Sequence, residues 1–153
     1  GFAHGYTYAG NPLACSAGLA VLQEVARLGL VHRAEVQGGK LKSALRNLMQ
    51  RFPFIGDVRG KGLLLAFELV ADRETMQPLP AKFNAHVELV EQAYSRGLII
   101  YSRRTRGGLE GDHFMVCPPL IVSDEQLVEI TDILVESLEA LAVQLGLEVW
   151  SGA

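Results

Sequence analysis

The sequence has 153 residues and lacks any apolar run that approaches the ~18 residues needed to cross a bilayer, so we expect no transmembrane helix. Its first residues contain neither a basic start nor an apolar signal core, which argues against a secretory peptide and favours a cytoplasmic protein. The net charge is −3, with neither a basic stripe nor a long acidic run. Nucleic acids and membranes are therefore not expected as partners.

Cysteine is also scarce. Cys15 and Cys117 are far apart, and each stands among apolar or small residues. This pattern predicts two buried thiols in a reducing compartment, although a disulfide stays open as an alternative. No Cys/His cluster has the spacing of a zinc site, so we expect no metal.

Hydrophobic residues make up 49% and charged residues 20% of the chain, as in ordinary globular domains. Apolar periodicity, glycine and proline stops and a Ser123–Gln126 capping box predict the secondary structure. The predicted elements are helices over about 12–28 and 30–51, strands over 55–59 and 63–70, a helix over 84–96, strands over 98–101 and 113–117, and a last helix ending before Gly146. Residues 102–112 are expected to form a loop. This order predicts an α+β fold, a small mixed β-sheet covered by helices.

Thr7 is the first candidate for a binding residue. It stands between Gly5 and Gly10, shortly before the predicted helix start at Asn11-Pro12. A threonine hydroxyl together with backbone N–H groups can bind an oxygen of a phosphate or carboxylate. The spacing matches neither a Walker loop nor a dinucleotide-binding fingerprint, so a tight turn before a buried helix is the structural alternative.

Arg59 is a second candidate, because it precedes the glycine turn Gly60-Lys61-Gly62. One interpretation is structural, with the guanidinium in an ion pair or capping carbonyl groups. The other is that Arg59 helps to orient a substrate carboxylate.

The whole string GFAHGYTYAGNPLACSAGLAVL resembles the His-Gly-x-Thr-aromatic-x-Gly-Asn/His-Pro segment of class III aminotransferases, which are pyridoxal-phosphate enzymes of fold type I. The similarity continues at residues 57–63, which match the family's VRGxGL strand turn. It includes residues 96–99 and also residues 117–121, which lead into the last helix. These four motifs follow the family's order and cover about residues 1–145.

The resemblance implies the C-terminal portion of a transaminase that moves an amino group between an amine or amino acid and a 2-keto acid. The nearest type is the amine or omega-amino acid:pyruvate transaminase. Residues 1–29 would belong to the large cofactor domain, residues 30–146 would form the small domain, and residues 147–153 a tail. The first helix should then expose an apolar side that the large domain covers.

In the family, the lysine that forms the Schiff base lies upstream of the His-Gly-x-Thr segment. None of the four lysines here is expected to take that role, so the sequence offers no catalytic residue, and a truncated chain of these residues alone is expected to be inactive. The matching threonine of the family reaches the cofactor phosphate across a dimer interface. The resemblance therefore implies that Thr7 binds pyridoxal 5'-phosphate in a homodimer with a shared cofactor site.

The substrate carboxylate needs a clamp, and arginine binds carboxylates bidentately. Ornithine- and acetylornithine-type members carry an arginine two residues before the Pro-Pro pair, but no residue near Pro118-Pro119 is basic. Amine:pyruvate members use an arginine on a mobile loop upstream of that strand. We therefore expect Arg104 or Arg106 to bind the carboxylate, and the alternative is that the arginines at 103, 104 and 106 are solvated loop charges.

Two other functions remain open. The missing lysine is also consistent with a free-standing, non-catalytic domain for dimerisation or interaction. An aminomutase or a racemase of the same fold would differ mainly in residues upstream of this sequence.

Overall fold

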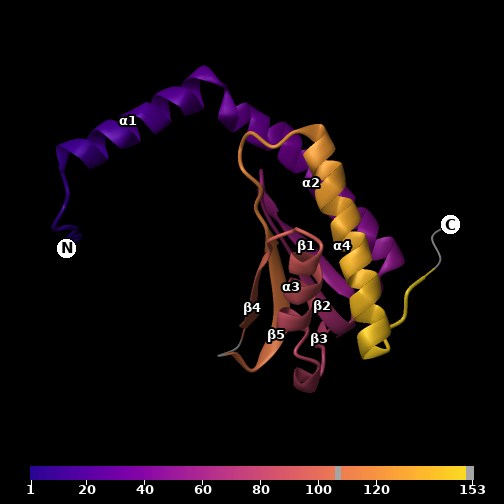
Figure 1. Cartoon of the computed structure of the whole chain (residues 1–153). Helices are drawn as coiled ribbons and strands as arrows, with labels where there is room; N and C mark the ends of the chain where they lie inside the picture. Colours follow the sequence, from indigo (N-terminus) through magenta and orange to yellow (C-terminus); the bar gives the residue numbers. More distant parts are fainter. Residues whose placement is uncertain (106–107, 151–153) are drawn as a thin grey trace.

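The computed structural model describes residues 1–105 and 108–150, and in it a long helix leads away from a compact α+β body (Figure 1). The elements are α1 (Pro12–Arg27), α2 (Leu30–Arg51), β1 (Ile55–Lys61), β2 (Leu64–Asp72), β3 (Gln77–Pro78), the 3-10 helix η1 (Ala81–Phe83), α3 (Ala85–Ser95), β4 (Tyr101–Thr105), β5 (Glu110–Val116) and α4 (Asp124–Leu145). The predicted fold class, a small sheet covered by helices, is confirmed.

The main sheet has the strand order β1-β2-β5-β4, and the short β3 pairs with β2. Every pairing in the described chain is antiparallel, which corrects the expected mixed sheet. The expectation came from the helical crossover between β2 and β4, which usually joins parallel neighbours. Here β5 lies between those two strands and pairs with both, so β2 and β4 run in the same direction without touching.

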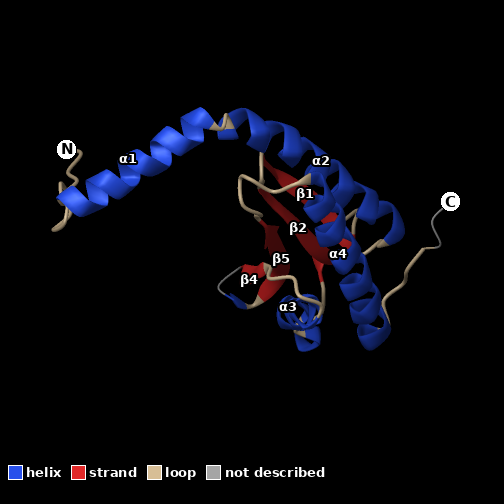
Figure 2. Cartoon of the chain, turned by 45° about the horizontal axis from the view of Figure 1, so that its top comes forward, coloured by secondary structure: helices blue, strands red, loops and turns tan. Residues whose placement is uncertain are grey.

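The core lies between the sheet and the helices α2, α3 and α4, which gather on one side of the sheet (Figures 1 and 2). On β2, the buried Leu65, Phe67 and Leu69 alternate with the more exposed Leu64, Ala66 and Glu68, as expected when one sheet face is covered. On that covered face, the rings of Phe67 and Phe114 stack with their centroids 5.1 Å apart.

The helix α2 runs without interruption through Gly38-Gly39, although two glycines lower helix propensity. Gly38 faces the glycine turn after β1 so closely that a Cβ atom built on it would lie 2.2 Å from the carbonyl carbon and oxygen of Gly62. Gly39 has no atom within 4 Å of its Cβ position. Gly38 is therefore a contact point between helix and sheet, and Gly39 is not.

The helix α1 has no buried residue. Its side chains are largely aliphatic, and Leu13, Leu19, Val21 and Leu22 are all exposed. The helices α1 and α2 meet at Gly29, whose φ of 60° lies in the left-handed region, and their axes are bent by 64°. In the described chain no single helix is long and apolar enough to span a membrane; α1 and α2 meet that test only together, as a bent pair.

Both cysteines are exposed and free, so the prediction of two buried thiols is wrong. Cys15 lies on α1, which has no buried residue, and Cys117 follows the end of β5. At the other end of the chain, Leu147 packs on the core, and the backbone N–H of Trp150 donates to the carbonyl of Arg51 at 2.8 Å. The described part of the tail thus rests against α2.

Candidate functional site

Thr7 lies in an exposed turn over residues 7–10, directly before α1. Backbone hydrogen bonds from Ala9 to Tyr6 (2.9 Å) and from Asn11 to Tyr8 (3.1 Å) shape this turn. Asn11 then caps the helix, because its side-chain oxygen accepts from the N–H of Ala14 at 3.1 Å. Among the described residues the Thr7 hydroxyl has no hydrogen-bond partner, so it is free to donate to an external group.

The turn could supply one contact to a phosphate but not a complete site. A phosphate dianion needs cationic partners or several N–H donors. In the described chain no Lys or Arg side chain pairs with residues 1–11, and Arg27 at the far end of α1 is paired with Glu24 at 2.6 Å. The Thr7 hydroxyl therefore fits one neutral donor of a phosphate site whose charge comes from elsewhere.

Arg104 lies on strand β4 and not in a loop, which corrects the sequence interpretation of residues 102–112. Its side chain is 12% exposed, and its Nε donates to Oδ1 of Asp112 at 3.1 Å. The Asp112 side chain is only 1% exposed, and Nδ1 of His86 lies 3.1 Å from the same oxygen, outside hydrogen-bond geometry. The guanidinium of Arg104 thus already neutralises a buried carboxylate.

Arg106 lies outside the described residues. Arg103 is exposed on β4, one position before Arg104, so its side chain belongs to the opposite face of the sheet. The sequence pointed to a loop because arginines and glycines are dense there. The strand register brings Arg103 opposite His113 and Arg104 opposite Asp112 instead.

Arg59 forms an ion pair, as the structural interpretation of the sequence predicts. Its Nη1 lies 3.0 Å from Asp57 and 2.8 Å from Glu68, on the strands β1 and β2. Burial by itself lowers the pKa of the Arg59 guanidinium, but the hydrogen bonds to the two carboxylates outweigh it and raise the pKa. The structure thus gives Arg59 two partners within its own sheet.

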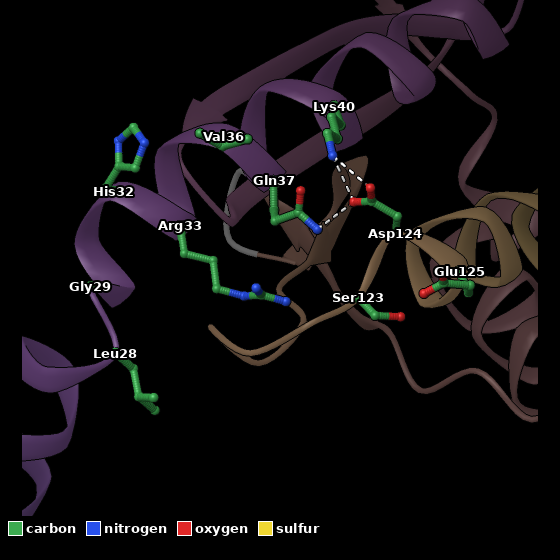
Figure 3. A pocket seen from close by; sticks show the side chains of 10 residues that line it. All are labelled: Leu28, Gly29, His32, Arg33, Val36, Gln37, Lys40, Ser123, Asp124 and Glu125. Atoms are coloured by element: carbon green, nitrogen blue, oxygen red, sulfur yellow. Dashed lines mark hydrogen bonds and ion pairs between the residues drawn. The ribbon is translucent and has the colours of Figure 1, made fainter.

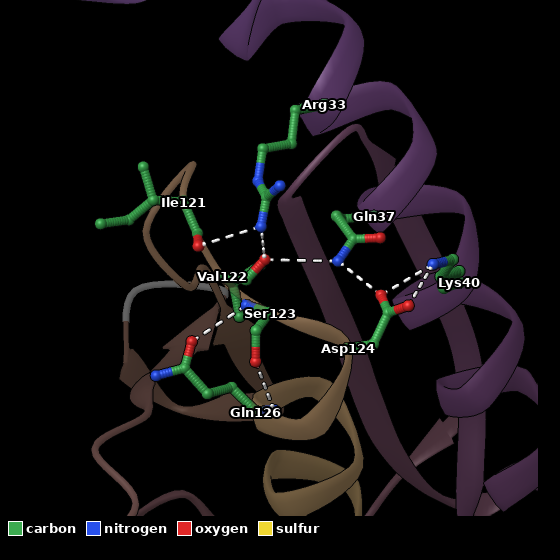
Figure 4. A network of polar contacts seen from close by, with 8 residues as sticks. All are labelled: Arg33, Gln37, Lys40, Ile121, Val122, Ser123, Asp124 and Gln126. Atoms are coloured by element: carbon green, nitrogen blue, oxygen red, sulfur yellow. Dashed lines mark hydrogen bonds and ion pairs between the residues drawn. The ribbon is translucent and has the colours of Figure 1, made fainter. Parts of the chain in front are cut away.

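A surface cavity of about 650 Å³ lies between α2 and the start of α4 (Figure 3). Several of its polar side chains form hydrogen bonds that join α2 to residues 121–124 (Figure 4). Arg33 donates to the carbonyls of Ile121 (3.2 Å) and Val122 (2.6 Å), and Gln37 and Lys40 both donate to Asp124 at 2.7 Å. This network fastens α4 to α2, and sequence reasoning missed it, although positions 33, 37 and 40 share one face of a helix.

The network predicts acid sensitivity. Hydrogen bonds from Lys40 and Gln37 hold the pKa of the Asp124 carboxyl below its usual value. The contribution of the carboxylate to stability is therefore present above the usual pKa of about 3.9 and is lost as the pH falls through the lower folded value. We expect Asp124→Asn to lower the urea midpoint at neutral pH and to differ less from the parent as the solution becomes acidic.

Asp132→Asn is the matched control, because Asp132 is exposed on the same helix and has no ion-pair partner among the described residues. Its urea midpoint should follow that of the parent at every pH. If the difference in urea midpoint between Asp124→Asn and the parent did not change with pH, the assigned role of the carboxylate would be contradicted.

In the described chain no group of three or more His, Cys, Asp or Glu side chains is arranged to hold a metal ion. Among the described residues, Thr7 and the arginines of the sheet are also not brought together. Thr7 lies before α1, and the arginines lie on β1 and β4.

Comparison with known proteins gives one consistent family. The model described as aminotransferase class-III matches residues 1–138. The uncharacterized aminotransferase YodT of Bacillus subtilis is 36% identical over 144 residues, which are 92% of this chain and 32% of the relative. The leucine/methionine racemase of Thermococcus litoralis is 36% identical over 126 residues, which are 82% of this chain and 26% of that protein.

Solved structures agree with the sequence relatives. An (S)-enantioselective omega-transaminase from Thermomicrobium roseum matches 92% of this chain and 30% of its own length, with 30% identity and a TM-score of 0.79. A PLP-bound (internal aldimine) amine transaminase from an uncultivated Pseudomonas species matches 90% of this chain and 30% of its own length, with 32% identity and the same TM-score. The chain thus spans about a third of the length of the proteins that it matches.

Proposed function

The chain belongs to the class III aminotransferase family, and we propose that it is the C-terminal part of a pyridoxal-phosphate-dependent transaminase. The reaction would move an amino group between an amine or amino acid and a 2-keto acid. The observation that carries this proposal is the family match over residues 1–138, which includes the Thr7 turn, the Gly60–Gly62 turn and the Pro-Pro step before α4.

We propose that the chain contributes to two domains. Residues 1–29 would belong to the large cofactor domain, because α1 leaves the body and exposes its aliphatic side chains. Residues 30–146 would form the small domain, since they supply the buried core. A second subunit and the large domain would cover α1, as expected for an apolar surface of this extent.

The proposed cofactor is pyridoxal 5'-phosphate, which acts as an electron sink when it is bound. Thr7 would donate its hydroxyl hydrogen to the phosphate from the partner side of a homodimer. The Schiff-base lysine would lie in another part of the enzyme. Lys40 is paired with Asp124, and Lys42 donates to the carbonyl of Gly60 at 3.0 Å, so both ammonium groups already serve the small domain.

The assignment of the substrate carboxylate to Arg104 or Arg106 stays a prediction. For Arg104, binding a carboxylate would require the guanidinium to leave Asp112 or to serve both groups at once. If the guanidinium left Asp112, a buried carboxylate would lose its cation, which would lower the stability of the fold.

The test of the proposal is Thr7→Ala in the complete enzyme. A hydrogen bond to a charged group contributes about 1.5–3 kcal/mol, so we expect the dissociation constant of pyridoxal phosphate to rise about tenfold or more. Titration of the apoenzyme with the cofactor, followed by fluorescence, measures it.

Thr7→Ser is the matched control, because it keeps the hydroxyl and should retain nearly all of the affinity. An unchanged dissociation constant in Thr7→Ala would remove Thr7 from the cofactor site.

A second candidate reaction follows from one relative. The leucine/methionine racemase shares 36% identity with this chain over 126 residues, so racemisation on the same fold is the alternative. The two reactions are separated by incubating the complete enzyme with L-leucine in the absence of any keto acid. A racemase would form D-leucine, whereas a transaminase would need a 2-keto acid and would consume it.

A further inference from the structure

A second surface cavity, of about 760 Å³, lies where two of the sequence motifs meet α2. Its walls come from α2, from the glycine turn Gly60–Gly62 with the start of β2, and from residues of the segment 117–120, which follows β5. These segments are far apart in the sequence, and the fold brings them to one place. The volume is within the range of small-molecule sites, about 300–1,000 Å³.

Much of the cavity wall is apolar, with Ala34, Leu63 and Pro118 among its lining residues. Three large aliphatic side chains of the wall are exposed, with 77% for Val31, 61% for Leu64 and 41% for Leu120. Removing such surfaces from water is favourable. The wall therefore suits the hydrocarbon part of a ligand.

Two lysines from different elements also line this cavity. Nζ of Lys42 on α2 donates to the carbonyl of Gly60 at 3.0 Å, which uses one of the three hydrogens of the ammonium group. Lys61, the last residue of β1, is exposed and has no hydrogen-bond or ion-pair partner among the described residues. The acidic residue of the described wall is Glu35, which lies 3.8 Å from Nδ1 of His32. The wall therefore carries more positive than negative charge.

We propose that this cavity binds a small aliphatic carboxylate. The carboxylate lies at the ammonium groups of Lys42 and Lys61, and the hydrocarbon chain contacts Val31, Leu64 and Leu120. The charge of the wall favours an anion over a cation, and the aliphatic side chains favour an apolar tail. The cavity shares no lining residue with the turn before α1 or with strand β4, so the site is additional to the proposed function and does not depend on it.

Calorimetry of the complete protein with hexanoate, butyrate and hexylammonium tests the chemistry of the site. Each buried methylene contributes about fourfold to affinity, so hexanoate should bind about tenfold more tightly than butyrate. Hexylammonium has a chain of the same length and the opposite charge, and it should not bind. Equal binding of hexanoate and hexylammonium, or no binding of hexanoate, would overturn the proposal.

Substitutions in the wall test its charges. Lys61→Gln should raise the dissociation constant of hexanoate about fivefold, as the loss of one exposed charged contact does. Glu35→Gln should act in the opposite direction and tighten binding, because it removes a negative charge from the wall.

Lys82→Gln is the matched control, because Lys82 is exposed on η1 outside the cavity and the substitution changes the net charge by the same amount. It should leave hexanoate binding unchanged. Equal effects of Lys61→Gln and Lys82→Gln would contradict a local site.

The two free cysteines provide a footprint of the ligand. The exposed Cys117 lines the cavity, whereas Cys15 lies on α1 outside it. Saturating hexanoate should slow the alkylation of Cys117 by iodoacetamide about fivefold or more and leave the rate at Cys15 unchanged. Mass spectrometry of the alkylated peptides measures both rates. Protection of both thiols, or of neither, would overturn the assigned position.

The outcome is separable from that of the proposed function. Hexanoate binding that depends on Lys61 in a protein without amino transfer would keep this site and remove the transaminase. Active amino transfer in a protein that binds hexanoate only in competition with pyruvate would keep the transaminase and remove this site.

Discussion

Gly38→Ala is expected to lower the free energy of unfolding by about 3 kcal/mol, as overpacking of a tight contact does. The added Cβ would lie 2.2 Å from the carbonyl carbon and oxygen of Gly62 and 2.6 Å from its Cα. These are backbone atoms, so no side chain can rotate away, and either α2 or the glycine turn must move. Urea denaturation of the two proteins measures the difference.

Gly39→Ala provides the matched control in the neighbouring residue. Gly39 has no atom within 4 Å of its Cβ position, and alanine favours a helix over glycine by about 1 kcal/mol. The control should therefore be neutral or more stable than the parent. Equal losses at both positions would show that the helix does not approach the turn as described.

Arg104→Ala is expected to cost about 3 kcal/mol of unfolding free energy, because it removes one partner of a buried ion pair. The Asp112 carboxylate is 1% exposed, and among the described residues only His86 would still lie close to its Oδ1. Arg103→Ala on the exposed face of the same strand should change stability by less than about 1 kcal/mol. Urea denaturation distinguishes the two neighbouring arginines.

A double-mutant cycle isolates the pair. Asp112→Asn removes the buried charge, so Arg104→Ala should cost much less in that background than in the parent. If Arg104→Ala cost the same in both backgrounds, the two residues would not act as a pair, and Arg104 would be available for a substrate.

The elements with strong local signals were predictable from the sequence. The capping box at Ser123 and Gln126 marks the start of α4, and both of its hydrogen bonds are present. The helix α2 ends at Arg51, just before Phe52-Pro53, as the proline indicates. In these regions the chain carries its own start and stop signals, so no distant contact is needed to define them.

The position of strand β4 was predicted wrongly, because no such local signal defines where it begins and ends. The apolar residues 98–101 predict a strand, but the strand is Tyr101–Thr105, which contains two arginines. Its position depends on pairing with β5 and on the buried Asp112, which compensates Arg104. Contacts between segments that are distant along the chain leave no local signal in the sequence. The same is true of an ion-pair partner that only the strand register reveals.

The candidate site was predictable only in part. The motif around Thr7 identified the exposed turn before α1, and the structure places its hydroxyl where an external group can accept from it. The network of Arg33, Gln37 and Lys40 with α4 was missed, because its acceptors lie more than 80 residues away in sequence. The alternation of Arg103 and Arg104 between two sheet faces became visible only with the strand register.

Native mass spectrometry of the endogenous protein, captured with an antibody against α4, tests the central claim most directly. The account predicts a dimer whose chains are several times heavier than 16.6 kDa and which carries pyridoxal phosphate. A native chain of 16.6 kDa without pyridoxal phosphate would contradict it and would favour a free-standing interaction domain.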